Sequence, residues 1–157
     1  MSPRRFFRAA TGRAGAVVAG VMVGLAIGVG GFTFWYGKGA SYLTNDPSAC
    51  ANCHIMQAHY DGWLQASHRS VAACNDCHTP HDIVGKYFVK GKNGFWHSFA
   101  FTTGWFPEPL RIREANRRVT EAACRDCHAE VARLVDGPDA AEPRSCIPCH
   151  EHVGHRE

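Results

Sequence analysis

The chain has 157 residues, including eight cysteines and ten histidines, and a formal net charge of +3 at neutral pH. This length allows one domain with an appendage. Four arginines in the first 13 residues account for the basic excess, because from Lys38 onward 13 Lys and Arg residues stand against 14 Asp and Glu residues. A nucleic-acid-binding domain carries its basic excess in the folded part, so this distribution argues against nucleic acid and for a membrane partner.

Residues 14–36 predict a transmembrane helix. None of these 23 side chains is charged. A helix of that length extends roughly 34 Å, enough to cross a hydrocarbon core of about 30 Å. With arginines before the stretch and Lys38 after it, the positive-inside rule places the N-terminus in the cytoplasm. We therefore expect a basic cytoplasmic tail (1–13), an anchor (14–36) in the inner membrane and a periplasmic domain (37–157).

A cleaved signal peptide is the alternative interpretation of this apolar stretch. The stretch is longer than the roughly 7–15 apolar residues of a signal peptide, and no clean small-x-small cleavage site follows it. An uncleaved anchor is therefore the preferred prediction.

Three glycines in the anchor, Gly20, Gly24 and Gly28, recur every four residues. This spacing places them on one helix face, where small residues let two helices pack closely. Self-association through the anchor is one interpretation. The general abundance of glycine in membrane helices is the other.

The eight cysteines form four Cys-x-x-Cys-His motifs, and no cysteine is left over. The cysteines are Cys50 and Cys53, Cys74 and Cys77, Cys124 and Cys127, and Cys146 and Cys149, followed by His54, His78, His128 and His150. Two thiols at this spacing bind the vinyl groups of a haem, and the next histidine reaches the iron. Zinc sites and disulfides can use paired cysteines, but neither requires a histidine after each pair. The sequence therefore predicts four haem c groups, which agrees with a periplasmic domain.

The predicted fold is mainly α with little regular structure. Roughly 30 residues per haem are too few for an extensive protein core. We therefore expect one transmembrane helix followed by a small multihaem domain whose core is the haems themselves. Four arginines form a cluster that could pair with haem propionates or form a solvated helix face: Arg111, Arg113, Arg117 and Arg118.

Four irons need four distal ligands if every haem is six-coordinate. Six histidines outside the motifs are candidates: His59, His68, His81, His97, His152 and His155. Met56 stands two residues after His54. Its thioether could bind the first iron and raise that haem's potential, or simply pack.

These features resemble the NapC/NirT family of membrane-anchored multihaem quinol dehydrogenases, and within it the small subunit of cytochrome c nitrite reductase. The resemblance covers nearly the whole chain. The residues that carry it are the anchor, the four motifs, Met56, Trp63, Ser67-His68, Thr79-Pro80 and Gly154-His155.

The resemblance implies a set of iron ligands. Met56 would ligate the first iron in place of His54, whereas His78, His128 and His150 would be the proximal ligands of the other irons. His68 and His155 would be distal ligands, for the fourth and third haems respectively. A partner subunit would supply the distal ligand of the second haem.

The resemblance also implies a function. The first haem would take electrons from menaquinol, and the chain would pass them to a periplasmic nitrite reductase catalytic subunit. The alternative is another reductase of nitrate, trimethylamine oxide or metal. The chain itself would not reduce nitrite, since none of its cysteine pairs is followed by lysine.

Residues 83–106 suit a quinol site at the membrane surface, because eight aromatic residues are interspersed there with three lysines. Quinol oxidation releases protons, so a polar group beside the haem must accept one. Lys90, which matches a lysine of the family's quinol site, and His97 are the candidates. Lipid headgroup contact is the alternative for Lys90, and a structural or iron-binding role for His97. His59 and His81 are expected to be structural or to lie at a haem edge.

Overall fold

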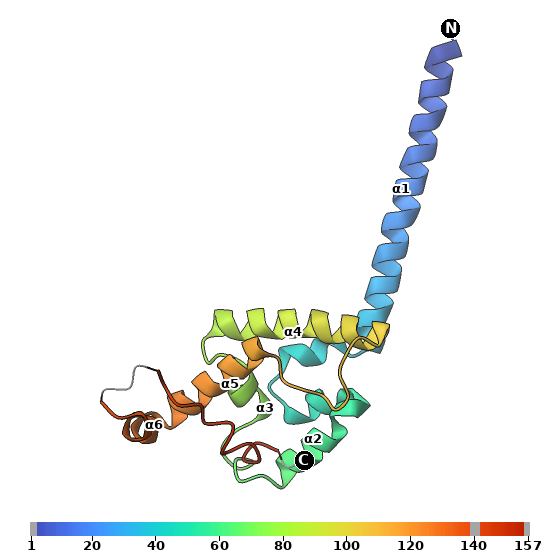
Figure 1. Ribbon diagram of the computed structural model, residues 1–157. Coiled ribbons are helices and arrows are strands. Elements are labelled where there is room, and N and C mark those ends of the chain that lie inside the picture. The colour runs from blue at the N-terminus through green and yellow to red at the C-terminus, as the bar shows by residue number, and fades with distance from the viewer. Residues whose placement is uncertain (1–2, 139–141, 156–157) are drawn as a thin grey trace. The chain divides into compact units, whose positions relative to one another are not determined.

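The structure is a computed structural model that describes residues 3–138 and 142–155. Residues 1–2 of the predicted tail, and residues 139–141 and 156–157 of the predicted periplasmic domain, lie outside the described part. The chain divides into two compact units, residues 1–40 and residues 41–157 (Figure 1).

The first unit is built on one long helix, α1 (Pro3–Tyr36), which continues through the predicted basic tail. Proline is well tolerated at the start of a helix because the first amide needs no partner there. The segment Gly12–Tyr36 reaches a mean hydropathy of 2.1 and buries none of its residues. After Tyr36 the chain leaves the helix, and Lys38 adopts a positive φ of 50°. The helix is long and apolar enough to cross a membrane.

The second unit contains short helices joined by turns. Its elements, with the linking turn η1, are η1 (Gly39–Leu43), η2 (Pro47–Asn52), η3 (His54–Met56), α2 (Gln57–Leu64), α3 (Cys74–His78), α4 (Ile83–Thr103), α5 (Glu114–Cys127) and α6 (Ala129–Asp136). No strand occurs in residues 3–138 and 142–155. The predicted mainly α fold is therefore confirmed.

The second unit has almost no apolar core of its own. Among the described residues, the buried apolar side chains are Ala66 and Ala123, and the buried polar ones are Thr79 and Lys90. In the described part of the chain, the 21-residue helix α4 packs closely on no other helix, and Asn116 of α5 reaches it with a side-chain hydrogen bond to Oδ1 of Asn93 at 3.2 Å. Such sparse packing between helices is expected of a domain whose core is haem.

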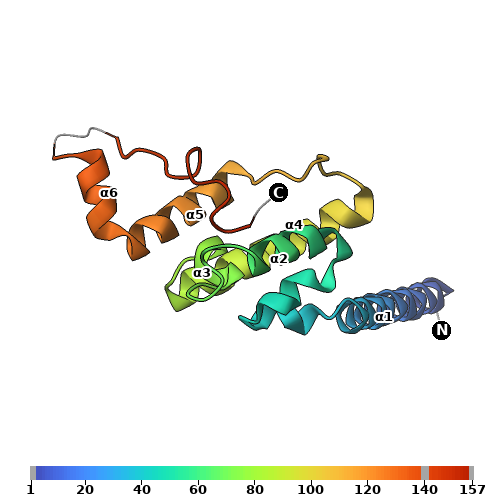
Figure 2. The same cartoon turned by 90° about the horizontal axis from the view of Figure 1, so that it is seen from below.

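The closest helix pair is α3 and α5, which lie side by side in both views (Figures 1 and 2). The C-terminal segment returns to α2, where the rings of His59 and His155 meet with centroids 5.0 Å apart. These two approaches bring together motifs and histidines that are far apart in sequence.

Candidate functional site

Each cysteine motif lies on a short helix or turn. The first lies along η2, the second forms α3, the third ends α5 and the fourth forms the turn at residues 146–149. In α3, Cys74 and Cys77 are three residues apart and His78 follows four residues after Cys74, so all three lie on one helix face. All eight cysteines are free of disulfide bonds. One face therefore presents two thiols and an imidazole, as covalent haem attachment requires.

Consecutive motifs are neighbours in space. A hydrogen bond with the Cys74 thiol lowers the pKa of Cys50 to about 7, and the same contact raises the pKa of Cys74. The pKa of Cys77 is raised by burial, then by Asp76 and by Cys127 of the third motif. Burial and then Cys146 of the fourth motif raise the pKa of Cys124. With haem attached, these sulfur atoms are thioethers and do not titrate. The pKa effects therefore indicate only which cysteines lie near one another, and they place the attachment points in chain order.

His78 and His155 form the first histidine pair. Their ring centroids are 6.4 Å apart and the rings are nearly parallel, with an interplanar angle of 10°. Burial, and then the nearby His155, His59 and His97, lower the pKa of His78 to about 4. A neutral imidazole is the form that binds a metal ion.

His68 and His128 form the second pair, with ring centroids 6.0 Å apart and an interplanar angle of 83°. Nδ1 of His68 lies 3.1 Å from the carbonyl oxygen of Val153. A hydrogen bond from Nδ1 to a carbonyl is the usual support of a metal-binding histidine, because it leaves Nε2 as the ligand atom.

Both spacings fit an iron between the rings. A metal lies about 2 Å from an imidazole nitrogen, so two rings on opposite sides of one iron have centroids roughly 6 Å apart. Both centroid separations are close to this value.

These ring contacts differ from the pairing that the resemblance implies, which stays a prediction. His155 lies opposite His78 of the second motif and not at the third, and His68 lies opposite His128 of the third motif and not at the fourth. The physical reason is the path of the C-terminal segment, which returns to α2 and brings Val153 against His68. Among the described residues, no imidazole ring lies opposite that of His54 or His150.

The two candidate ligands of the first iron differ in exposure. Met56, the last residue of η3, is half-buried, whereas His54 is exposed. Both lie in the same short turn, and the Met56 amide donates to the Cys53 carbonyl over 2.8 Å. The turn thus fixes the methionine close to the haem-binding cysteine.

Lys90 of α4 is held by oxygen atoms. It is 7% exposed, and its ammonium donates to the Thr44 carbonyl at 2.6 Å and to Oδ1 of Asn45 at 3.4 Å. Burial and then Lys86 lower its pKa, while Cys50 acts in the opposite direction. Lys90 is therefore close to the first motif, but two of its three N–H groups are directed to the 44–45 turn.

His97 follows Lys90 by seven residues, so the two lie on the same face of α4. It is exposed, and partial desolvation and then Arg113 lower its pKa. The opposite face is apolar: Val84 is 80% exposed, Phe88 70% and Phe95 63%. The helix thus separates a polar face toward the haem-binding segments from an aromatic face.

His81 has a structural position that the spacing of the sequence did not reveal. Its Nε2 lies 2.9 Å from the Asp76 carbonyl oxygen, and its Nδ1 lies 3.4 Å from the Asp126 carboxylate. Since both ring nitrogens are engaged, His81 is not arranged as an iron ligand. His152, also considered as a ligand, lies 3.4 Å from Glu151 and is exposed.

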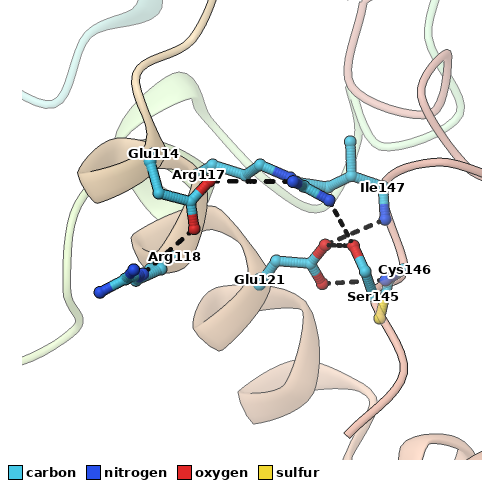
Figure 3. A network of polar contacts seen from close by, with 7 residues as sticks. All are labelled: Glu114, Arg117, Arg118, Glu121, Ser145, Cys146 and Ile147. Atoms are coloured by element: carbon cyan, nitrogen blue, oxygen red, sulfur yellow. Dashed lines mark hydrogen bonds and ion pairs between the residues drawn. The ribbon is translucent and has the colours of Figure 1, made fainter.

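The fourth motif is held by a polar network centred on Glu121 of α5 (Figure 3). The Glu121 carboxylate accepts hydrogen bonds from the Ser145 hydroxyl, from the Cys146 amide at 2.9 Å and from the Ile147 amide at 3.2 Å. Arg117 donates to the same hydroxyl at 2.9 Å. Arg117 and Arg118 also pair with Glu114, so half of the predicted basic cluster is used within α5.

Comparison with known proteins supports a cytochrome c. The profile of the NapC/NirT cytochrome c family, N-terminal region, matches residues 13–157. The cytochrome c-type protein NrfH of Wolinella succinogenes is 35% identical over 146 residues, which cover 86% of this chain and 82% of that protein. The cytochrome c-type protein TorC of Escherichia coli is 28% identical over 90% of this chain and 42% of its own length.

A solved structure has the same fold. A chain in the crystal structure of the cytochrome c nitrite reductase NrfHA complex bound to the HQNO inhibitor superposes with a TM-score of 0.61 at 23% identity, covering 90% of this chain and 93% of that chain. The profile match and the 35% identity to NrfH extend over most of the sequence, including all four motifs and the apolar helix. The protein is therefore an NrfH-like, membrane-anchored haem c protein, and the chain belongs to the NapC/NirT cytochrome c family.

Proposed function

We propose that this protein oxidises menaquinol with four haems and passes the electrons to the catalytic subunit of a periplasmic cytochrome c nitrite reductase. The observation that carries the proposal is the spatial succession of the motifs, Cys50 beside Cys74, Cys77 beside Cys127 and Cys124 beside Cys146. Haem groups attached at these points follow one another as an electron relay. The nitrite reductase complex of a relative with the same fold supports the choice of partner.

Residues near the first motif would receive the quinol. The haem supplies one-electron acceptance, and the protein must bind the quinol and take up its protons. Lys90 keeps its ammonium beside the first motif, where a third N–H group can donate to a quinol oxygen. His97, with its lowered pKa, is neutral at physiological pH and can accept a proton.

The aromatic face of α4 would lie on the periplasmic surface of the inner membrane, with residues 1–13 in the cytoplasm and residues 37–157 outside. Exposed Phe88 and Phe95 suit the boundary between headgroups and acyl chains, and Lys92 can extend toward lipid phosphates. A quinol dissolved in the membrane would then reach the polar face of α4 without crossing bulk water.

The fourth haem would be the exit. His78 and His128 each have a second histidine opposite them, whereas His150 has none among the described residues and is exposed. The partner subunit would supply the missing ligand of this iron. In this proposal the partner's ligand therefore binds the fourth haem, whereas the resemblance implies the second. Complex formation then becomes part of the haem chemistry.

The deciding experiment is purification from native membranes in mild detergent, followed by mass spectrometry of the co-purifying proteins. A nitrite reductase in stoichiometric amount, with menaquinol-dependent nitrite consumption by the complex, is the expected result. A reductase of nitrate, trimethylamine oxide or metal in its place would keep the quinol chemistry and change the pathway. Failure of menaquinol to reduce the purified protein would refute the entry step.

A further inference from the structure

Side chains inside the second motif reach the first. Asn75, which follows Cys74 directly, donates from Nδ2 to the Thr44 carbonyl at 3.1 Å and to Oδ1 of Asn45 at 3.3 Å. Thr44 and Asn45 immediately precede η2, the turn that carries the first motif. Lys90 donates to the same two oxygens from α4. One residue between two haem-binding cysteines thus fixes the second motif to the start of the first.

The third motif reaches the second through its own intervening residue. Asp126, which precedes Cys127, contacts Nδ1 of His81 at 3.4 Å. His81 follows the second motif by three residues and is joined to it by Nε2, which lies 2.9 Å from the Asp76 carbonyl oxygen. The imidazole therefore connects two motifs with its two nitrogens.

The other intervening residue of the third motif reaches the fourth. Arg125 donates to Asp136 at 2.5 Å and to the Arg144 carbonyl at 2.5 Å. Arg144 stands two residues before Cys146, and its amide donates to the same Asp136 carboxylate at 2.9 Å. Together with Glu121, Arg125 attaches the fourth motif to α5 (Figure 3 shows the Glu121 part).

We propose that Asn75, Asp126 and Arg125 are positioning residues for electron transfer, each fixing the separation of one pair of consecutive haems. The inference rests on the proposed electron relay. Each pair of consecutive motifs, here called a junction, is joined by a polar contact. In each case the contact comes from a residue between the two cysteines of the second or third motif. Protein side chains alone pack little at these junctions, because the buried apolar side chains of the described residues are Ala66 and Ala123. Directional polar contacts therefore add to the packing that the haems themselves provide.

The test uses the full-length haem-containing protein in detergent, with Asn75→Ala, Asp126→Ala and Arg125→Gln. Arg133→Gln is the matched control, since Arg133 is exposed on α6 and forms no ion pair with another described residue. Electrons are injected photochemically, and the rate of their redistribution among the haems is measured. The circular dichroism of the Soret band is recorded on the same samples. We expect each variant to retain four haems by mass and to slow electron redistribution at its own junction severalfold relative to the control. Rates and dichroism equal to those of the control would overturn the proposal.

A variant that lost a haem would be replaced by a partner substitution outside the motifs. His81→Ala removes the same contact as Asp126→Ala and leaves every cysteine motif intact. If both single variants slow the same step and the double variant is no slower, the contact itself is the cause. Independent, additive effects would refute it. Because the electrons come from light and not from quinol, failure of menaquinol oxidation or of nitrite reduction would count against the proposed function alone.

Discussion

At the scale of single residues, the choice between Met56 and His54 decides the chemistry of the first iron. Both side chains come from the turn that begins at Cys53, and the methionine is the more buried of the two. A thioether stabilises the reduced iron relative to an imidazole, so the identity of this ligand determines how readily the first haem accepts an electron.

Replacing Met56 tests this ligand. Met56→Leu should lower the midpoint potential of the first haem, or change its spin state, while the haem remains attached through Cys50 and Cys53. Redox titration and the visible spectrum of the purified protein measure both effects. Met22→Leu, in the apolar helix, is the control. An unchanged spectrum and potential would assign the iron to His54.

Glu121 provides a second prediction, about pH. Burial acts to raise its pKa, but the hydrogen bonds from Ser145, Cys146 and Ile147 outweigh burial and lower it. A carboxyl group whose pKa is lower in the folded state stabilises the fold above its unfolded pKa, and this contribution disappears as the pH falls through the folded value. Glu121→Gln should therefore cost about 1–3 kcal/mol at pH 7.

Urea unfolding of the haem-containing protein at several pH values would measure the effect. The difference between wild type and Glu121→Gln should shrink as the pH falls below the ordinary range of carboxylates. Glu130→Gln, on the exposed surface of α6, is the control. A difference that stayed constant down to acid pH would contradict the assigned role of the carboxylate.

Sequence spacing predicts which residues bind haem, but not which histidines face each other. The motifs are local, so their cysteines and histidines are visible in five consecutive residues. The contacts of His68 with His128 and of His155 with His78 join segments 60 and 77 residues apart, as their residue numbers show, and depend on the return of the C-terminal segment. Likewise, nothing in the sequence around His81 indicates that Asp126 will contact it.

At the scale of elements, α4 combines two surfaces with different partners. Asp82 caps its start by accepting a hydrogen bond from the Gly85 amide at 2.7 Å, and Gly104, with a φ of 70°, ends it in the left-handed region that favours glycine. Between these ends, the polar face carries Lys90 and the opposite face carries Phe88 and Phe95. The aromatic composition predicted an interfacial segment, whereas the tie between Lys90 and the 44–45 turn could not be predicted, because it depends on tertiary contacts.

The aromatic face can be tested in liposomes. The double variant Phe88→Gln/Phe95→Gln should raise the KM for menaquinol by about tenfold or more, since burying one Phe side chain contributes about 1.5 kcal/mol or more. Reduction by a water-soluble donor should not change, because it does not depend on contact with the membrane. An unaltered KM for menaquinol would show that this face does not assist quinol access.

At the scale of the whole molecule, we infer that the second unit depends on its prosthetic groups for its fold. The composition predicted this dependence, because roughly 30 residues per haem cannot enclose an apolar core. The structure agrees, since α4 packs closely on no other described helix and the motifs are joined by polar contacts.

Blocking haem attachment should therefore unfold the second unit. We expect protein produced without cytochrome c maturation to lose most of the helical circular dichroism of residues 41–157 and to be cleaved by protease at many sites there. The apolar helix α1 should remain helical in detergent, since its backbone hydrogen bonds are internal. A protease-resistant second unit without haem would show that the protein part folds independently.

The two histidine pairs also differ in the angle between their rings, which is 10° for His78 and His155 but 83° for His68 and His128. Parallel imidazole planes split the iron d orbitals of a low-spin ferric haem strongly, whereas perpendicular planes leave two of them almost degenerate. If each pair ligates one iron, as proposed, electron paramagnetic resonance of the oxidised protein should contain one rhombic signal and one highly anisotropic signal from the two haems. Those two haems, with identical ligand sets, would be distinguishable in a frozen solution by ring orientation alone.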